Sequence, residues 1–397
     1  MIRRLTLPLL LLVLAAVAAA LPALRGDAQE ITSPPSVEEV PLGDASVLQG
    51  IGWQQEVAAE ANLVAVQWTG DTGAAFTIEA QGDDGQWEPA GTIGEQDNGP
   101  DPGTPEGVAA AQLATNTSEP LWTDDISAVR VTLTDGSAQD VSLVAIDSPP
   151  VGDLAENQPE QGNALAGGLA AMGVTGVAVA FVSGRRRLLA LGVLAAIVAV
   201  GCAPAKKGPP GAPVPDSIVS HATWGGDLPW QSGNAQCGTS GPAYASDIGF
   251  AVVHHTVNSN FYTPDQSVQV IRGIWAHHAN VNQWCDIGYN FLIDRFGRIF
   301  EGRWGGWDQA VVGAHAVGFN TGGVGIAFIG DHRFEPVTGE SYASLINLIA
   351  WKFQVHTVDA TPWNSIIGHR DVNATECPGN AAYGLLPGIR DAVRQRV

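Results

Sequence analysis

The stretch GHRDVNATECPG, at residues 368–379, places His369 and Cys377 eight positions apart near the end of the chain. Far upstream, the apolar run FAVV leads directly into His254 and His255. Imidazole and thiolate are ligands that zinc prefers, and two His with one Cys would leave the fourth tetrahedral position free, as in catalytic rather than structural sites. On spacing alone, however, a His-x7-Cys pair is more often coincidence than a metal site.

Five sequence blocks occur in a fixed order around these residues. They are VVHHT at residues 252–256, WCDIGYNFLIDRFGRIFEGR at 284–303, GAHAVGFN at 313–320, GVGIAFIGD at 323–331 and GHRDVNATECPG at 368–379. Together they resemble the peptidoglycan recognition protein domain, which is also the type 2 N-acetylmuramoyl-L-alanine amidase domain. The resemblance spans residues 216–397 and implies an α/β fold, with a central mixed sheet flanked by helices.

The apolar patterning of this part predicts the same kind of fold. The expected strands are 248–255, 289–294, 298–303, 323–329 and 365–368, and the expected helices are 264–283, 340–356 and 381–395, the last with Pro387 as a possible kink. His277 and His278 fall on the first helix about 100° apart, so either is open to a plain surface role, and neither is assigned to metal.

The resemblance implies a Zn²⁺ site whose ligands fall on His254, His369 and Cys377. Because side chains alternate faces along a strand, His254 and His255 cannot both face one metal, and His255 is left to pack or to hydrogen-bond. Non-enzymatic receptors of the family lack the ligand cysteine. Cys377 is therefore the main reason to expect an enzyme, which would hydrolyse the amide between the lactyl group of N-acetylmuramic acid and L-alanine in peptidoglycan.

The resemblance assigns roles to further residues. Tyr289 and Thr375 correspond to positions that support the reaction, and some relatives carry Lys in place of the Thr. Residues expected to contact the muramyl peptide are His315, Asn320, Arg303 and Trp307. A supporting or core role for His315 stays equally open.

A disulfide is also expected from the resemblance. Relatives often tie the segment before the tyrosine of the IGYNF block by a disulfide, usually to a cysteine that follows the first ligand His. This sequence has no cysteine there. A Cys237–Cys285 pair, in an exported module where oxidation is favoured, is the expected substitute.

Charge divides the chain into two parts. The 397 residues suffice for two or three domains, and the formal net charge of −21 argues against nucleic acid as a partner, since phosphate binding requires basic patches. Residues 26–163 contain 25 acidic residues and one basic residue, Arg130, whereas all nine histidines lie at or after His221. The chemistry is therefore expected in the C-terminal part.

The N-terminal part is predicted to be an export segment followed by an all-β module. Residues 1–24 begin with arginines before an apolar run, which is typical of a signal peptide or signal anchor, and residues 25–44 are expected to be an unstructured tether. Over residues 45–148, Val-, Ile- and Thr-rich runs, most clearly at 63–68, 75–80, 129–133 and 141–146, alternate with turns such as GDTG and GDDG, which favours a β-sandwich. The loop at 94–107 contains three prolines and no periodicity.

Two apolar runs in residues 164–205 flank three arginines at 185–187. The first run, 19 residues, would span about 28 Å as a helix, close to the ~30 Å bilayer core, and the arginines favour the cytoplasmic side. The sequence thus predicts a membrane helical hairpin and, beyond a Pro-rich linker at 206–215, an amidase module on the outer side of a bacterial cell membrane. A lipoprotein signal ending at Cys202 is the alternative, by resemblance.

Three functions are compatible with these observations. The first is a zinc amidase that cleaves peptidoglycan at the cell envelope. The second is a module that binds or senses peptidoglycan without cutting it, and the third is a structural envelope protein in which the β-sandwich does the main work.

Overall fold

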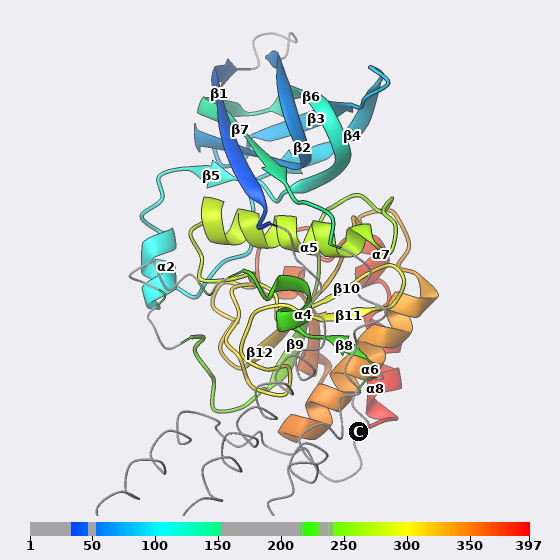
Figure 1. The fold of residues 1–397 in the computed structure, drawn as a ribbon. Helices are drawn as coiled ribbons and strands as arrows, with labels where there is room; N and C mark the ends of the chain where they lie inside the picture. Colours follow the sequence, from blue (N-terminus) through cyan, green and yellow to red (C-terminus); the bar gives the residue numbers. More distant parts are fainter. Residues whose placement is uncertain are drawn as a thin grey trace, which may run out of the picture. The chain divides into compact units, whose positions relative to one another are not determined.

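The computed structural model describes residues 33–46, 53–151, 217–228 and 241–397, together with the single residues 215, 230 and 237. These residues all belong to one compact unit of the chain. They form two β-sheets (Figure 1). The described residues up to 151 are called the N-terminal module, and those from 215 onward the C-terminal module.

One antiparallel sheet with strand order β1-β7-β2-β6-β3-β4 forms the N-terminal module, and the short β5 pairs with β2. The strand bounds are β1 Ser36–Ser46, β2 Gln54–Gly70, β3 Ala75–Gln81, β4 Trp87–Gly94, β5 Asn116–Thr117, β6 Leu121–Asp135 and β7 Ser137–Asp147. Alternation along β3 buries Phe76, Ile78 and Ala80 on one face, where they pack with Val129 and Val131 of β6.

Two predictions for this module are corrected. The sandwich of two packed sheets is wrong, because β2 pairs with both β6 and β7, and β6 pairs in turn with β3, which joins all the strands into one sheet. The tether is wrong over residues 36–44, which pair along β7 as part of the edge strand β1, Ser36–Ser46. Partner hydrogen bonds from β7 can hold such a polar segment although its own β-propensity is weak.

A six-stranded mixed sheet forms the centre of the C-terminal module, in the order β13-β9-β12-β10-β11-β8. The bounds are β8 Ile218–Val219, β9 Phe250–His255, β10 Phe291–Ile293, β11 Ile299–Glu301, β12 Gly323–Phe328 and β13 Ile366–Gly368. Only the β10–β11 pair is antiparallel among these described strands. This is the mixed sheet that the sequence predicts for residues 216–397.

Helices pack against this sheet and against the N-terminal module. The helical segments are α2 Pro105–Ala110, α4 His221–Gly225, α5 Gln266–Ala276, η2 His277–Val281, α6 Gly339–His356, η3 Trp363–Ser365, η4 His369–Asp371, α7 Asn380–Tyr383 and α8 Leu386–Arg394. Helices α6 and α8 bury Leu345, Leu348 and Ile389 in one core with strand residues. Helix α5 meets the N-terminal module so closely that a Cβ on Gly273 would lie 2.2 Å from Leu63 Cδ1.

Three further predictions are corrected. The helix expected over 264–283 is α-helical only to Ala276 and continues as the π-helix η2. The last helix is divided into α7 and α8, with Pro387 in the first turn of α8. The fold class that included a membrane hairpin is not supported: no helix in the described part of the chain is long and apolar enough to cross a membrane, and residues 164–205, where the hairpin was expected, lie outside that part.

Candidate metal centre

Two neighbouring parallel strands deliver the histidines predicted to bind metal. Strand β9 ends at His254 and His255, and its partner β13 leads directly into His369. Cys377 follows in the loop after η4. The ligand atoms of His254, His369 and Cys377 all lie within 4.8 Å of one another, and all three side chains are buried.

The donor atoms lie close enough together to share one metal ion. Cys377 Sγ lies 3.6 Å from His254 Nδ1, close to the about 3.5 Å edge that Zn–S and Zn–N bonds of ordinary length would give. His254 Nε2 lies 3.1 Å from His315 Nδ1, and His369 Nε2 lies 3.0 Å from Asn373 Oδ1. These outer contacts leave the two Nδ1 atoms available toward the thiol.

The site contains an orphaned polar atom that a metal would satisfy. His369 Nδ1 is buried and has no hydrogen-bond partner among the described residues. Burial lowers the pKa of His254 well below its usual value, which keeps this imidazole neutral as a ligand must be. Burial also raises the pKa of the Cys377 thiol, an effect that a bound dication would reverse. The three residues therefore fit zinc.

The predicted catalytic side chains, Tyr289 and Thr375, line a cavity of about 480 Å³ that Cys377 also lines. Tyr289 is 1% exposed, and its ring centroid lies 5.5 Å from that of His254. Burial raises the pKa of Tyr289 well above its usual value, so its hydroxyl stays protonated. Thr375 Oγ1 accepts a 2.8 Å hydrogen bond from the backbone N–H of Cys377, which fixes the loop that carries the thiol.

The four residues predicted to contact substrate take different places. His315 is fully buried beside His254, so the structure places it behind a metal ligand. Asn320 Oδ1 accepts from the backbone N–H of His315, which supports the same ring. Arg303 is buried in an ion pair, described below, and the half-buried Trp307 packs against the α6–sheet core, outside the residues that line the cavity.

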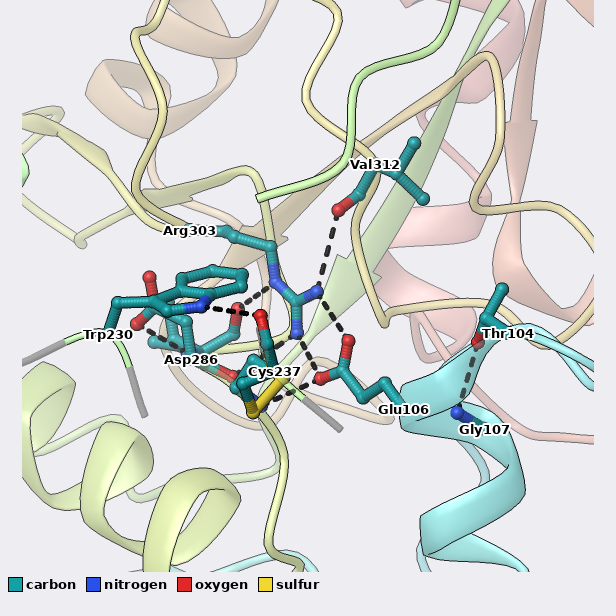
Figure 2. Close-up of a disulfide and its surroundings, with 10 residues drawn as sticks. Thr104, Glu106, Gly107, Trp230, Cys237, Asp286, Arg303 and Val312 are labelled. Atoms are coloured by element: carbon teal, nitrogen blue, oxygen red, sulfur yellow. Dashed lines mark hydrogen bonds and ion pairs between the residues drawn. A yellow bond between two sulfur atoms is a disulfide. The ribbon is translucent and has the colours of Figure 1, made fainter. Parts of the chain in front are cut away.

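Cys237 and Cys285, the expected pair, form a disulfide with an S–S distance of 2.16 Å (Figure 2). It lies beside the buried guanidinium of Arg303, which donates to Glu106 of the N-terminal module. Glu106 Oε1 also accepts a 2.8 Å hydrogen bond from the backbone N–H of Cys285. The disulfide segment is thus bound both covalently and through a carboxylate from the other module.

Other histidines of the module support the site without facing the metal position. His255 Nδ1 accepts a 3.0 Å hydrogen bond from the backbone N–H of His332, in agreement with the predicted hydrogen-bonding role. His277 and His278 are fully buried, so a surface role is wrong for both. The ring of His278 stacks on Trp284 at 4.5 Å between centroids.

The N-terminal module supplies residues to this cavity that the sequence analysis did not predict. Asp97 and Glu119 line it together with Tyr289, Thr375 and Cys377. Burial, followed by the nearby charge of Asp97, raises the pKa of Glu119 to about 8. The only sequence signal was an acidic, proline-containing loop without periodicity, which does not reveal what it contacts.

Comparisons with known proteins identify the family of the C-terminal module. Residues 244–380 match the family described as N-acetylmuramoyl-L-alanine amidase. The chain is 33% identical over 176 residues to peptidoglycan-recognition protein SC2 of Drosophila simulans, covering 43% of this chain and 84% of that protein. It is 34% identical over 141 residues to N-acetylmuramoyl-L-alanine amidase of Mus musculus, covering 35% of this chain and 26% of that protein. Wild-type Drosophila PGRP-LB, a solved structure, is 29% identical with a TM-score of 0.36, over 42% of this chain and 91% of that chain. Through its C-terminal module, this chain belongs to the peptidoglycan recognition protein family.

Proposed function

We propose that this chain is a zinc-dependent N-acetylmuramoyl-L-alanine amidase that cleaves peptidoglycan. The observation that carries the proposal is that the ligand atoms of His254, His369 and Cys377 lie within 4.8 Å of one another, and that Cys377 lines a cavity together with Tyr289. A purely structural zinc site would have four protein ligands, whereas the C-terminal module supplies these three, of which Cys377 lines the cavity. The substrate follows from the family, whose relatives are named for peptidoglycan recognition and for the amidase activity.

The residues of the chain would divide the chemistry between them. Zinc in such a site supplies Lewis-acid activation of water and of the scissile carbonyl. Tyr289 would donate its hydroxyl proton in a hydrogen bond to the negative charge that develops on the carbonyl oxygen. Its raised pKa suits this role, since a phenolate could not donate.

The surrounding residues would hold the ligands in position. His315 and Asn373 contact the outer nitrogens of His254 and His369, and contacts of this kind fix the ring orientation and the tautomer. Thr375 would act twice, because its oxygen accepts from the Cys377 N–H while its own O–H remains to donate into the cavity that it lines. Given the expected export segment, this activity would lie outside the cytoplasmic membrane.

A second function, peptidoglycan binding without cleavage, is favoured by one specific observation. The Tyr289 hydroxyl already accepts a 2.9 Å hydrogen bond from Asn98 Nδ2 of the N-terminal module. Asn98 therefore lies within hydrogen-bond distance of the hydroxyl that a substrate carbonyl would have to reach. Binding and cleavage can be separated by experiment, because only cleavage releases fragments.

The test combines metal analysis with fragment release by the full chain. Zinc content and muropeptide release from purified peptidoglycan are measured for the wild type and for Cys377→Ser. A hydroxyl is a harder and far less acidic ligand than a thiol, so both quantities should fall together. Full zinc stoichiometry and unchanged release in Cys377→Ser would contradict the proposal, and zinc binding with no release by any variant would favour the binding-only function.

A further inference from the structure

The connection between β4 and β6 runs across the candidate metal centre. We call residues 95–119 the cover segment. Its two ends are joined by a bridge between Glu95 and Ser118 and by a 2.7 Å hydrogen bond from the backbone N–H of Gln96 to the carbonyl of Thr117. The segment is therefore a closed loop held by the N-terminal sheet, and the residues between its ends meet the C-terminal module.

Two carboxylates anchor the cover segment on residues that were predicted to contact substrate. Asp101 Oδ1 accepts from Asn320 Nδ2 at 2.6 Å and from the backbone N–H of Gly318 at 2.8 Å. Glu106 accepts from both terminal nitrogens of Arg303 at 2.9 and 3.0 Å (Figure 2). An anionic peptide that used Asn320 and Arg303 would have to displace these two side chains.

A third carboxylate of the segment lies at the metal position. Asp97 Oδ1 is 3.6 Å from His369 Nδ1, the buried nitrogen that has no hydrogen-bond partner in the described residues. Two ligands of a tetrahedral zinc, one nitrogen and one carboxylate oxygen, are separated by about 3.4 Å. Asp97 also lines the same cavity as Cys377. Carboxylate is an ordinary zinc ligand, and the other three ligands leave one position free.

From this geometry we propose that Asp97 is the fourth protein ligand of the metal, so that the N-terminal module closes the metal site of its own chain. This inference rests on the proposed zinc site. It changes the expected behaviour of that site, since four protein ligands leave no position for water or substrate. Cleavage then requires that the cover segment move away from His369.

Asn98, the residue after Asp97, contacts the hydroxyl of Tyr289, the side chain proposed to act on the substrate. Asn98 Nδ2 donates to the Tyr289 hydroxyl at 2.9 Å and to Glu119 Oε1 at 2.5 Å. Glu119 is itself packed near His278, with 3.9 Å between Glu119 Oε2 and His278 Nε2. Asp97 and Asn98 therefore engage the metal position and the tyrosine at the same time.

The experiment uses the full chain loaded with Co²⁺, whose visible absorption reports the coordination of the metal. Azide, a small anion, is added as a probe for an open position. The wild-type spectrum should be insensitive to azide, whereas Asp97→Asn and Asp97→Ala should change the starting spectrum and shift further with azide. Asp83→Asn, at an exposed turn of the same sheet, is the matched control and should behave as the wild type.

The rate of zinc loss and the rate of fragment release give two further readouts, and both rates should rise in the Asp97 variants. Loss of a ligand should speed transfer of zinc to a chelator at least about tenfold in both Asp97 variants, since even outer contacts change affinity by 10–100-fold. Muropeptide release should rise in the same variants. A wild-type Co²⁺ spectrum that shifts with azide as the variants do would overturn the inference and leave the zinc amidase standing, whereas absence of metal binding by all of these proteins would overturn both.

Discussion

The ion pair between Glu106 and Arg303 joins the two modules at a buried position, and its removal should be costly. The side chains are 13% and 3% exposed, and the two N–H···O distances are 2.9 and 3.0 Å. Breaking one partner of a buried pair costs about 3–5 kcal/mol. Glu106→Gln retains an oxygen acceptor, and Arg303 Nε keeps its 3.0 Å hydrogen bond to the carbonyl of Ile287. We therefore expect a loss of about 2–3 kcal/mol, which corresponds to a fall in Tm of about 4–12 °C.

The assay is thermal unfolding of the full chain, followed by circular dichroism with the Cys237–Cys285 disulfide intact. Glu88→Gln is the matched control, because Glu88 is an exposed residue of β4. Its melting temperature should equal that of the wild type. If Glu106→Gln melts together with the control, the carboxylate does not bind the guanidinium in solution, and the anchoring of the cover segment at this point is refuted.

Three more outcomes are expected. Tyr289→Phe should lower muropeptide release about 10²–10³-fold with unchanged zinc content, which is the usual effect of losing one donor to the developing oxyanion. The control Tyr244→Phe, at an exposed tyrosine, should have no effect. Equal rates for both variants would exclude the proposed role of Tyr289. In the folded state Glu119 has a pKa of about 8, above its usual 4.5. Between these two pH values the folded state keeps a proton on Glu119 that the unfolded state has lost, so the free energy of unfolding should fall as pH rises from 5 to 8. Glu119→Gln should flatten this slope in urea titrations, and an unchanged slope would count against the burial of Glu119. Removal of metal by a chelator should lower the Tm because His369 Nδ1, which has no hydrogen-bond partner among the described residues, would lose the metal, and added zinc should restore the Tm. Identical melting of the chelator-treated and zinc-loaded proteins would show that no metal binds the folded state.

The candidate metal triad was predicted through the family resemblance, and local signals placed its parts on the fold. The apolar run before His254 predicts a buried strand, and a strand end fixes where the imidazole emerges. The GHRDVNATECPG block carries His369 and Cys377 within one short loop. In the structure β9 and β13 are parallel neighbours, which brings these separate segments to the same edge of the sheet.

The contribution of the N-terminal module could not be predicted in the same way. Asp97 and Asn98 lie in a loop whose composition indicates only a solvated, irregular connection. Their contacts with His369 and Tyr289 depend on how the two modules pack, and no local periodicity encodes a contact between residues so far apart in sequence. The burial of His278 could not be predicted for the same reason. Its helical position was compatible with a surface role, but Gln96 and Glu119 of the N-terminal module contact its ring in the structure.

Errors in the N-terminal fold have a related cause. The pattern of β-type runs and turns located four of the strands, since the runs predicted at 63–68, 75–80, 129–133 and 141–146 fall inside β2, β3, β6 and β7. It did not show how these strands pair, and the number of sheets depends on pairing alone. Strand β1 was missed because its polar residues are held by β7 rather than by their own propensity.

Product analysis on a defined muramyl peptide tests the proposed amidase most directly. The zinc-loaded full chain and its Asp97→Asn variant are incubated with a peptide linked through L-alanine to N-acetylmuramic acid, and the masses of the products are determined. The amidase predicts two fragments, the intact lactyl sugar acid and a peptide with a free amino group on L-alanine, formed faster by Asp97→Asn. Recovery of the intact substrate from both proteins, with zinc bound at full stoichiometry, would contradict it.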